Sequence, residues 1–302
     1  MDDILAPRFI DPAAARKHLE ALCWPDGPIC PHCGSLNATR LDGKKHRDGL
    51  VQCNDCREQF TVTVGTVFER SKIALNKWLL CNHLLCASKK GMSALQISRM
   101  LGVTYKTAWF MCHRIRAAMK PSDPAPLGGP GKIVESDEAF IGGKKQRRLS
   151  GKVAPKQKVV SLVERDGSAR SFHVASIHHN TLRAALVMNI DRASTLMTDE
   201  AGFYRIMGKE FAAHGTTLHA GLQFAKPGGI HSNTAENFFS ILKRGVIGTY
   251  HHWSPIHLHR YLAEFDFRYS TKHISDRERA DEALKGIGGK RLTYRRTDRL
   301  AA

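Results

Sequence analysis

The fold of the second half of the chain depends first on nine residues, Ile133–Ile141, which run Ile-Val-Glu-Ser-Asp-Glu-Ala-Phe-Ile. This run is predicted to be a β-strand. Because successive side chains of a strand point to opposite faces, Asp137 shares a face with Glu135, whereas Glu138 lies on the other face and points away from Asp137. The sequence therefore predicts a strand that carries acidic side chains near its middle.

The segments that follow are predicted to complete an α/β domain. In chain order they are strands at 159–163 and 171–175, a helix that opens at Asn180 or Thr181, and a strand at 194–198. Three antiparallel strands, a helix and a further strand are the order of a ribonuclease-H-like core, a mixed sheet with flanking helices. Such a sheet places carboxylates at the middle of its first strand and at the end of its fourth. Asp137 and Asp199 occupy these two positions.

A third acidic residue is expected from a later helix. Residues 232–244, Ser-Asn-Thr-Ala-Glu-Asn-Phe-Phe-Ser-Ile-Leu-Lys-Arg, fit such a helix, with Glu236 near its start. Lys243 lies seven residues later, about two turns of an α-helix, so both side chains point to the same side. Glu236 can hold a metal ion there, and Lys243 can contact a DNA phosphate. Asn237 beside Glu236, and Glu264 and Asp266 in a later helix, stay open as the third ligand. Glu135, on the same face as Asp137, stays open as an alternative to Asp137.

Phosphoryl transfer is the chemistry that needs three carboxylates in this order. Two divalent ions about 3.5–4 Å apart can activate the attacking oxygen and stabilise the leaving oxygen of an in-line displacement at phosphorus. Hard oxygen ligands select Mg²⁺ or Mn²⁺. In this hypothesis Asp137 bridges the two ions, Asp199 binds one of them and Glu236 binds the other.

Four cysteines near the N-terminus have the spacing of a zinc ribbon. Cys30 and Cys33 form one C-x-x-C knuckle, and Cys53 and Cys56 form a second about twenty residues later. Two thiolates from each tight turn complete a tetrahedron around one Zn²⁺ ion. Because four thiolates leave no open position for a substrate, the predicted zinc site is structural.

The middle of the chain, from about 76 to 120, has helical periodicity. Asn76 is predicted to cap a first helix, Ser93 a second and Thr104 a third, with a turn at Gly102 between the last two. This pattern is typical of a helix-turn-helix, whose last helix enters the major groove of DNA; a packing unit that contacts no DNA is the alternative. The expected base readers are Tyr105, Lys106 and Thr107, and the expected phosphate contacts are His113, Arg114 and Arg116.

Other basic residues extend the expected DNA interface into the second half of the chain. They are Lys144, Lys145, Arg147, Arg148, His231 and Arg244. A proline- and glycine-rich linker, 121–131, separates the two halves. The expected domains are a zinc ribbon (1–70), a helix-turn-helix segment (71–120), this linker, a catalytic domain (132–275) and a flexible basic C-terminal tail (276–302).

The charge of the chain favours a polyanionic partner. Lys and Arg number 46 and Asp and Glu 28, which gives a net charge of +18. Nucleic acid is the commonest such partner, because Lys and Arg release counterions when they neutralise phosphates. No apolar run reaches about 18 residues and no signal peptide is recognisable, so we expect a cytoplasmic protein whose cysteines are metal ligands or core thiols.

Several of these motifs resemble those of bacterial insertion-sequence transposases of the ISXO-two-like (IS-fifteen-ninety-five) family, the DDE transposases. The resemblance is carried by Glu135-Ser136-Asp137-Glu138 with Gly142-Gly143-Lys144, by Thr198-Asp199-Glu200 with Tyr204, and by His231 to Glu236 with Lys243-Arg244-Gly245. With the zinc ribbon, it covers nearly the whole chain. It implies that Asp137, Asp199 and Glu236 are the acidic triad and that Lys243 is the basic residue that follows it.

The function expected from these features is DNA transposition. The enzyme would cut element ends and join the 3′-hydroxyl to target DNA, with two Mg²⁺ or Mn²⁺ ions per active site and one structural Zn²⁺. Its partner would be double-stranded DNA, bound by a homodimer or larger assembly because two element ends must be held together. A non-catalytic DNA-binding regulator and a nuclease without joining activity are the alternatives.

Overall fold

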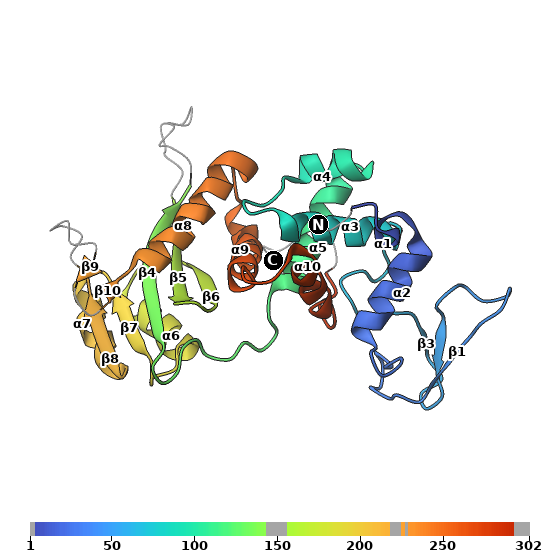
Figure 1. Ribbon diagram of the computed structural model, residues 1–302, viewed down its shortest axis with the longest axis horizontal. Helices are drawn as coiled ribbons and strands as arrows, with labels where there is room; N and C mark the ends of the chain where they lie inside the picture. Colours follow the sequence, from blue (N-terminus) through green and yellow to red (C-terminus); the bar gives the residue numbers. More distant parts are fainter. Residues whose placement is uncertain (1–3, 143–155, 218–224, 227–228, 293–302) are drawn as a thin grey trace, which may run out of the picture. The chain divides into compact units, whose positions relative to one another are not determined.

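We describe the chain from a computed structural model, which covers residues 4–142, 156–217, 225–226 and 229–292 (Figure 1). The chain divides into two compact units, Met1–Pro121 with Ile274–Ala302, and Ser122–His273. The division falls at Pro121, where the proline- and glycine-rich segment begins. In the described part of the chain, none of the helices is both long and apolar enough to span a membrane.

The first unit combines a small sheet with helices. Its elements are α1 (Pro7–Ile10), α2 (Pro12–Cys23), β1 (Ala38–Arg40), β2 (Val51–Cys53), β3 (Gln59–Phe60), α3 (Leu75–Ala87), α4 (Ala94–Leu101), α5 (Tyr105–Met119) and α10 (Asp276–Lys285). The three short strands form an antiparallel sheet in the order β1-β2-β3. Its core contains Cys30, Val51, Cys53 and Phe60, so two of the four knuckle cysteines are also packing residues.

The caps of α4 and α5 confirm the sequence prediction. The hydroxyl of Ser93 accepts a hydrogen bond from the Gln96 backbone N–H at 3.2 Å, and that of Thr104 accepts one from the Thr107 backbone N–H at 3.2 Å. Gly102 ends α4 in the left-handed conformation, at φ 59°, which glycine adopts without steric cost.

The predicted cap of α3 is wrong. This helix begins at Leu75, so Asn76 lies inside its first turn, and the residue at the N-cap position is Ala74. The Asn76 side chain instead donates to the backbone carbonyls of Phe9 and Ile10, at 3.2 and 2.9 Å. Its polar group therefore stabilises a tertiary contact with the end of α1.

The first part of the expected flexible tail forms a helix. Residues 276–285 form α10, which begins with a capping box between Ser275 and Glu278 and packs against α2, α3 and α5. Ala280, Ala283 and Leu284 are buried on this helix. The prediction missed the helix because charged side chains of both signs dominate the segment, whereas three small or apolar residues at helical spacing provide its packing face.

The second unit is built on a five-stranded mixed sheet. Its longer elements are β4 (Ile133–Ile141), β5 (Gln157–Glu164), β6 (Ala169–Val174), α6 (His179–Asn189), β7 (Thr195–Thr198), α7 (Gly202–Met207), β8 (Ala213–Thr216), α8 (Asn233–Gly245) and α9 (Leu258–Ser270). Shorter elements are η1 (Gly208–Glu210), β9 (Ala225–Lys226), β10 (Ile230–His231), the π-helical turn η3 (Val246–Tyr250) and η4 (Pro255–His257). The sheet order is β6-β5-β4-β7-β8.

Helices cover both faces of this sheet (Figure 1). One face of β4 and β5 contributes Ala139, Ile141 and Val159 to a core shared with α8 and α9. The other face contributes Val134 and Val160 to a core shared with α6 and α7. β4 is antiparallel to β5 and parallel to β7, so the ends of β4 and β7 lie at the same edge of the sheet.

Candidate active site and zinc centre

The acidic residues predicted from β4 lie on both of its faces. Glu135 and Asp137 alternate with Ser136 and Glu138, in the register that pairs Asp137 with Ser161 of β5. The parallel pairing of β4 with β7 ends at Glu135 and Met197. Two residues farther along each strand, Asp137 and Asp199 are at the same level, as expected for neighbouring parallel strands.

The structure brings Asp137, Asp199, Glu236 and Lys243 into one electrostatic environment. The pKa of Asp137 is raised to about 6: burial and the negative charges of Asp199 and Glu236 raise it, whereas a hydrogen bond from the backbone of Glu138 and the charge of Lys243 lower it. Each acid comes from a different element, since Asp137 lies on β4, Asp199 follows β7, and Glu236 lies on α8. Repulsion among three carboxylates of this kind favours the binding of a cation between them.

Local hydrogen bonds orient all three acids. Asp137 accepts one from the Glu138 backbone N–H at 2.7 Å. Asp199 accepts a hydrogen bond from the Ala201 backbone N–H at 3.1 Å, in the turn that leads into α7. Ser232 donates its hydroxyl proton to Glu236 at 3.4 Å. The carboxylates are hard oxygen donors, so the donor set fits Mg²⁺ or Mn²⁺.

Glu138 is the residue near this site that sequence reasoning missed. It lies on the opposite face of β4 from Asp137, as predicted, but its charge still interacts with those of Asp199 and Asp137. Its carboxylate accepts the phenolic hydrogen of buried Tyr204, and Tyr204 also contacts Ser136 at 3.1 Å. The pKa of Glu138 is raised to about 7: burial and the charges of Asp199 and Asp137 raise it, whereas the hydrogen bond from Tyr204 lowers it. The sequence feature that could have indicated a role for Glu138 is Tyr204, which belongs to the same motif as Asp199.

Glu135, the alternative to Asp137, and Glu264, an alternative to Glu236, are both fully buried. The Glu135 carboxylate accepts hydrogen bonds from Arg165 and from the first turn of α8. The Glu264 carboxylate pairs with Arg268 and accepts a hydrogen bond from the Tyr250 hydroxyl at 2.8 Å. Both carboxylates therefore have protein partners, whereas Glu236 and Asn237 are exposed.

The four knuckle cysteines converge on one point. The Sγ atoms of Cys30 and Cys56 are 3.6 Å apart, as are those of Cys33 and Cys53. Their four sulfur atoms all lie within 4.8 Å of one another, which makes them the one group of metal-binding side chains this compact among the described residues. Backbone hydrogen bonds from Cys56 and Asp55 lower the pKa of Cys53 to about 7, which favours the thiolate that binds metal. The cluster fits a structural zinc ion.

Of the expected DNA-binding residues on α5, only the first turn is at the surface. Tyr105 and Lys106 are exposed and Thr107 is half-buried. Arg114 and Arg116 are buried, so their expected role at DNA phosphates is wrong. Arg114 donates to the carbonyls of Glu69 and Leu292 and lies over the Phe110 ring.

His113, like Arg116, is buried, so its expected contact with a DNA phosphate is not available at the surface. Both side chains belong to the buried face of α5, at 0% and 2% exposure respectively, although each is polar. Helical periodicity predicts that both lie on α5, but the polarity of a side chain does not predict its exposure. Tertiary packing around the helix decides that question instead.

The other expected DNA contacts divide between described and undescribed residues. His231 is half-buried, with its Nδ1 3.2 Å from Glu135, and Arg244 is exposed at the end of α8. Lys144, Lys145, Arg147 and Arg148 lie outside the described residues. Cys81 and Cys86 are buried in α3, in agreement with the core role expected for such thiols.

Comparisons with known proteins identify the class of protein that carries these two sites. Residues 126–270 match the ISXO2-like transposase domain, a DDE transposase domain, and residues 11–59 match the transposase zinc-ribbon domain. The chain belongs to the ISXO2-like transposase family. It is similar to a protein described as an uncharacterized protein in transposable element ISH50, from Halobacterium salinarum, with 25% identity over 92% of this chain and 96% of that protein.

Proposed function

We propose that this chain cuts the ends of an insertion sequence and joins the new 3′-hydroxyl to target DNA. The observation that carries the proposal is the shared electrostatic environment of Asp137, Asp199, Glu236 and Lys243. A DNA-binding regulator would need no such group of acids. The order of the sheet, three antiparallel strands beside two parallel ones, supports assignment of the second unit to the ribonuclease-H-like class.

Three carboxylates have distinct roles in this proposal. Two divalent ions in such a site activate the attacking oxygen and stabilise the leaving oxygen of an in-line displacement. Asp137 would bind both ions, Asp199 one and Glu236 the other. Because the pKa of Asp137 is about 6, this side chain is ionised at neutral pH. Below that pH, protons compete with the metal ions for its carboxylate. Lys243, two turns beyond Glu236, would bind a DNA phosphate.

DNA recognition would come from the first unit. We assign the helix-turn-helix role to α4 and α5, with Tyr105, Lys106 and Thr107 as the base readers at the exposed start of α5. The cysteine cluster would hold one Zn²⁺ that stabilises the ribbon. A homodimer or larger assembly would hold two element ends together.

The test is strand nicking and joining on duplex DNA that carries the ends flanking this gene, with Mg²⁺ or Mn²⁺. Wild type is compared with Asp199→Ala and Glu236→Ala, and Asn237→Ala is the matched control on the same exposed turn. We expect both acid variants to lose joining by at least ~10³-fold, since each removes stabilisation of the transition state. Asn237→Ala should keep its activity.

The outcomes distinguish the competing functions. Metal-dependent joining that the acid variants lose, with DNA binding intact, would support transposition and its acids. Cleavage without joining would support a nuclease of the same fold. Sequence-specific binding without cleavage in either metal would contradict the catalytic proposal and favour a regulator. Loss of joining in Asn237→Ala but not Glu236→Ala would assign the third ligand to Asn237.

A further inference from the structure

The buried carboxylate of Glu135 contacts the first turn of α8. One carboxylate oxygen accepts from the backbone N–H groups of Thr234 and Ala235, at 2.8 and 2.9 Å, and the other accepts from the Thr234 hydroxyl at 2.9 Å. Ser232, at the N-cap position, makes no side-chain cap bond of its own. Glu135 therefore supplies from a strand the cap that a helix usually takes from its N-cap residue.

Other groups hold the Glu135 carboxylate in place. Arg165 donates its Nε hydrogen to Glu135 at 2.7 Å, and its other N–H groups donate to the carbonyls of Gly229 and His231, both at 2.8 Å. The Nδ1 atom of His231 lies 3.2 Å from the same carboxylate oxygen. Arg165 and Glu135 together therefore connect the middle of the sheet to the segment that leads into α8.

We propose that Glu135 is a positioning residue that sets where Glu236 lies relative to Asp137. Glu135 and Asp137 are two residues apart on the same face of β4, and Glu236 directly follows the capped N–H of Ala235. A rigid strand thus carries both one acid of the site and the anchor of the helix that carries another. The inference rests on the proposed function, in which Asp137 and Glu236 hold divalent ions.

The test compares zinc-loaded wild type with Glu135→Gln in the full chain. Gln keeps the size of the side chain but loses the charge that the helix start and Arg165 require. We expect Mn²⁺ binding, followed by electron paramagnetic resonance of the free ion, to weaken by about 10–100-fold, as for other changes to groups that orient metal ligands. Hydrogen exchange at the start of α8 should also become faster. Glu164→Gln, on β5 in the same sheet, is the control and should change neither measurement.

Unchanged Mn²⁺ affinity and unchanged exchange in Glu135→Gln would overturn the inference. If that variant does not fold, Thr234→Val removes a single hydrogen-bond donor and should give a smaller effect of the same sign; no effect there would also overturn it. The proposed function fails separately, if Asp137→Ala binds Mn²⁺ as well as wild type does. Hydrogen exchange at α8 would still report on the cap in that case.

An independent observation concerns the loop between β1 and β2 in the ribbon. Lys44, Lys45, His46 and Arg47 are consecutive and all exposed. Among the residues that the structure describes, no acidic side chain forms an ion pair with Lys44, Lys45 or Arg47. Three positive charges are therefore concentrated at the tip of a short hairpin.

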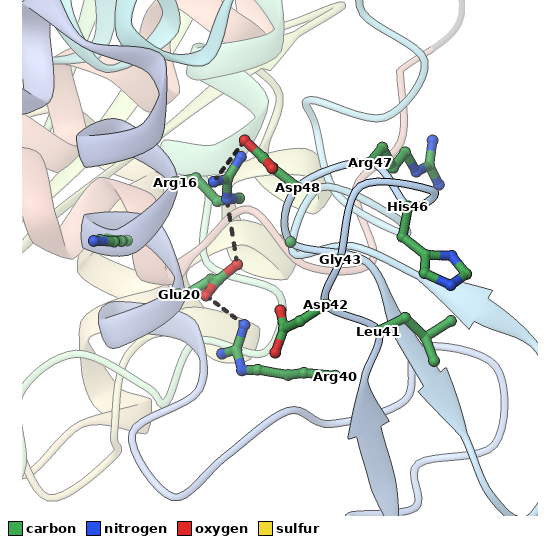
Figure 2. A pocket seen from close by; sticks show the side chains of 11 residues that line it. Arg16, Glu20, Arg40, Leu41, Asp42, Gly43, His46, Arg47 and Asp48 are labelled. Carbon is green, nitrogen blue, oxygen red and sulfur yellow. Dashed lines mark ion pairs between the residues drawn. The ribbon is translucent and has the colours of Figure 1, made fainter.

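Ion pairs hold the base of this loop against α2. Figure 2 shows Arg16 between Glu20 and Asp48, with Arg40 on the other side of Glu20. The nitrogen–oxygen distances are 3.9 Å for Arg16–Glu20, 3.5 Å for Arg16–Asp48 and 2.9 Å for Arg40–Glu20. His46 and Arg47 extend away from α2 in the same view. Gly49, at φ 73°, lets the chain pass Arg16, because a Cβ there would lie 2.4 Å from the Arg16 side chain. The carboxylates of Glu20 and Asp48 thus have arginine partners, whereas the cations at the tip have no acidic partner among the described residues.

We propose that this tip binds the phosphodiester backbone of double-stranded DNA without reading its sequence. Lys and Arg side chains without acidic partners are suited to phosphate contacts, which position a protein on DNA. The inference rests on the proposed function for its choice of DNA as the polyanion. It adds a second DNA contact to the one proposed for α5.

The test measures how the affinity for element-end and for unrelated duplex DNA depends on salt, by fluorescence anisotropy with zinc-loaded full chain. Each phosphate contact contributes about 0.9 to the slope of log K against log salt. The variant with Lys44, Lys45 and Arg47 changed to Ala should lower that slope by about 2–3 on both duplexes. The control changes three other exposed cations of the same unit to Ala: Lys72, Arg277 and Lys285.

We expect the control to change the slope by less than about one contact. An unchanged slope in the loop variant, or an equal change in the control, would overturn the inference. A loss confined to duplex RNA of the same length would identify RNA as the partner and also contradict it. Cleavage and joining play no part in this measurement, so a failure of the catalytic proposal would not affect the result.

Discussion

The cysteine cluster and the acidic cluster form in different ways. The four cysteines come from two knuckles within residues 30–56, and their sulfur atoms lie within 4.8 Å of one another. The three acids come from β4, the end of β7 and α8, between residues 137 and 236. A local motif therefore forms one cluster, whereas long-range packing forms the other.

The cores around the two clusters differ as well. The ribbon core contains four buried residues, two of which are cysteines of the cluster. The mixed sheet has a separate core on each face, shared with two helices on each side. From this difference we predict that the ribbon depends on its metal for folding, and that the second unit folds without metal and holds its acids in mutual repulsion.

Removal of zinc should have the largest effect on stability, and it should be confined to the first unit. Structural Zn²⁺ contributes on the order of 10–16 kcal/mol in small zinc-binding peptides, more than the short strands and small core of the ribbon can replace. We expect Cys53→Ser, or chelation of zinc, to unfold residues 30–60. Hydrogen exchange with zinc quantification measures this. Equal loss of protection in β4 and β5 would contradict the contrast between the units.

Arg268→Ala should cause the next largest loss, in the second unit. Arg268 and Glu264 form an ion pair on α9, at 7% and 0% side-chain exposure, and removal of one partner leaves a buried charge. Such a change costs about 3–5 kcal/mol of unfolding free energy. Urea unfolding checks this. The matched control is Arg183→Ala, which breaks a more exposed pair with Glu210 and should cost no more than about 1 kcal/mol.

Asp137→Asn should stabilise the metal-free second unit, to an extent that depends on pH. The pKa of Asp137 in the folded chain, about 6, lies above its usual 3.8. Between these values the folded chain binds more protons than the unfolded chain, so this group's contribution to stability falls as pH rises from about 4 to 6. Asn does not ionise, so the stability of the variant does not fall in this way between about pH 4 and 6.

We expect the variant to exceed wild type by about 1–3 kcal/mol at pH 7 and to match it near pH 4. Urea unfolding at both pH values, without divalent ions, gives the difference. A variant that is less stable than wild type at pH 7 would show that Asp137 is not held in repulsion.

Thr104→Ala should have the smallest effect, in the first unit. The Thr104 hydroxyl caps α5, and loss of such a cap costs about 1 kcal/mol. Thr104→Ser keeps the hydroxyl and is the control. Thermal unfolding of zinc-loaded protein measures the difference. Equal stability of the Ala and Ser variants would mean that tertiary packing alone holds this helix.

Much of the architecture was predictable because its determinants lie close together in the sequence. The two knuckles, the caps of α4 and α5 and the alternation along β4 depend on residues within a few positions of one another. The sequence also indicated Asp137, Asp199 and Glu236 by their positions on successive elements. The structure places these three acids in one environment, and their catalytic role is a proposal for experiment.

Only the tertiary structure decided how several charged side chains are used. Arg114 and Arg116 are buried, Glu135 caps a helix almost a hundred residues away, and Glu138 contacts Tyr204. A charged residue has the same local signature whether it lies in solvent or satisfies buried donors and acceptors. By itself the sequence determined elements such as β4, α4 and α5, whose periodicity and caps are local. Burial and partner choice depend on elements that meet only in the folded chain.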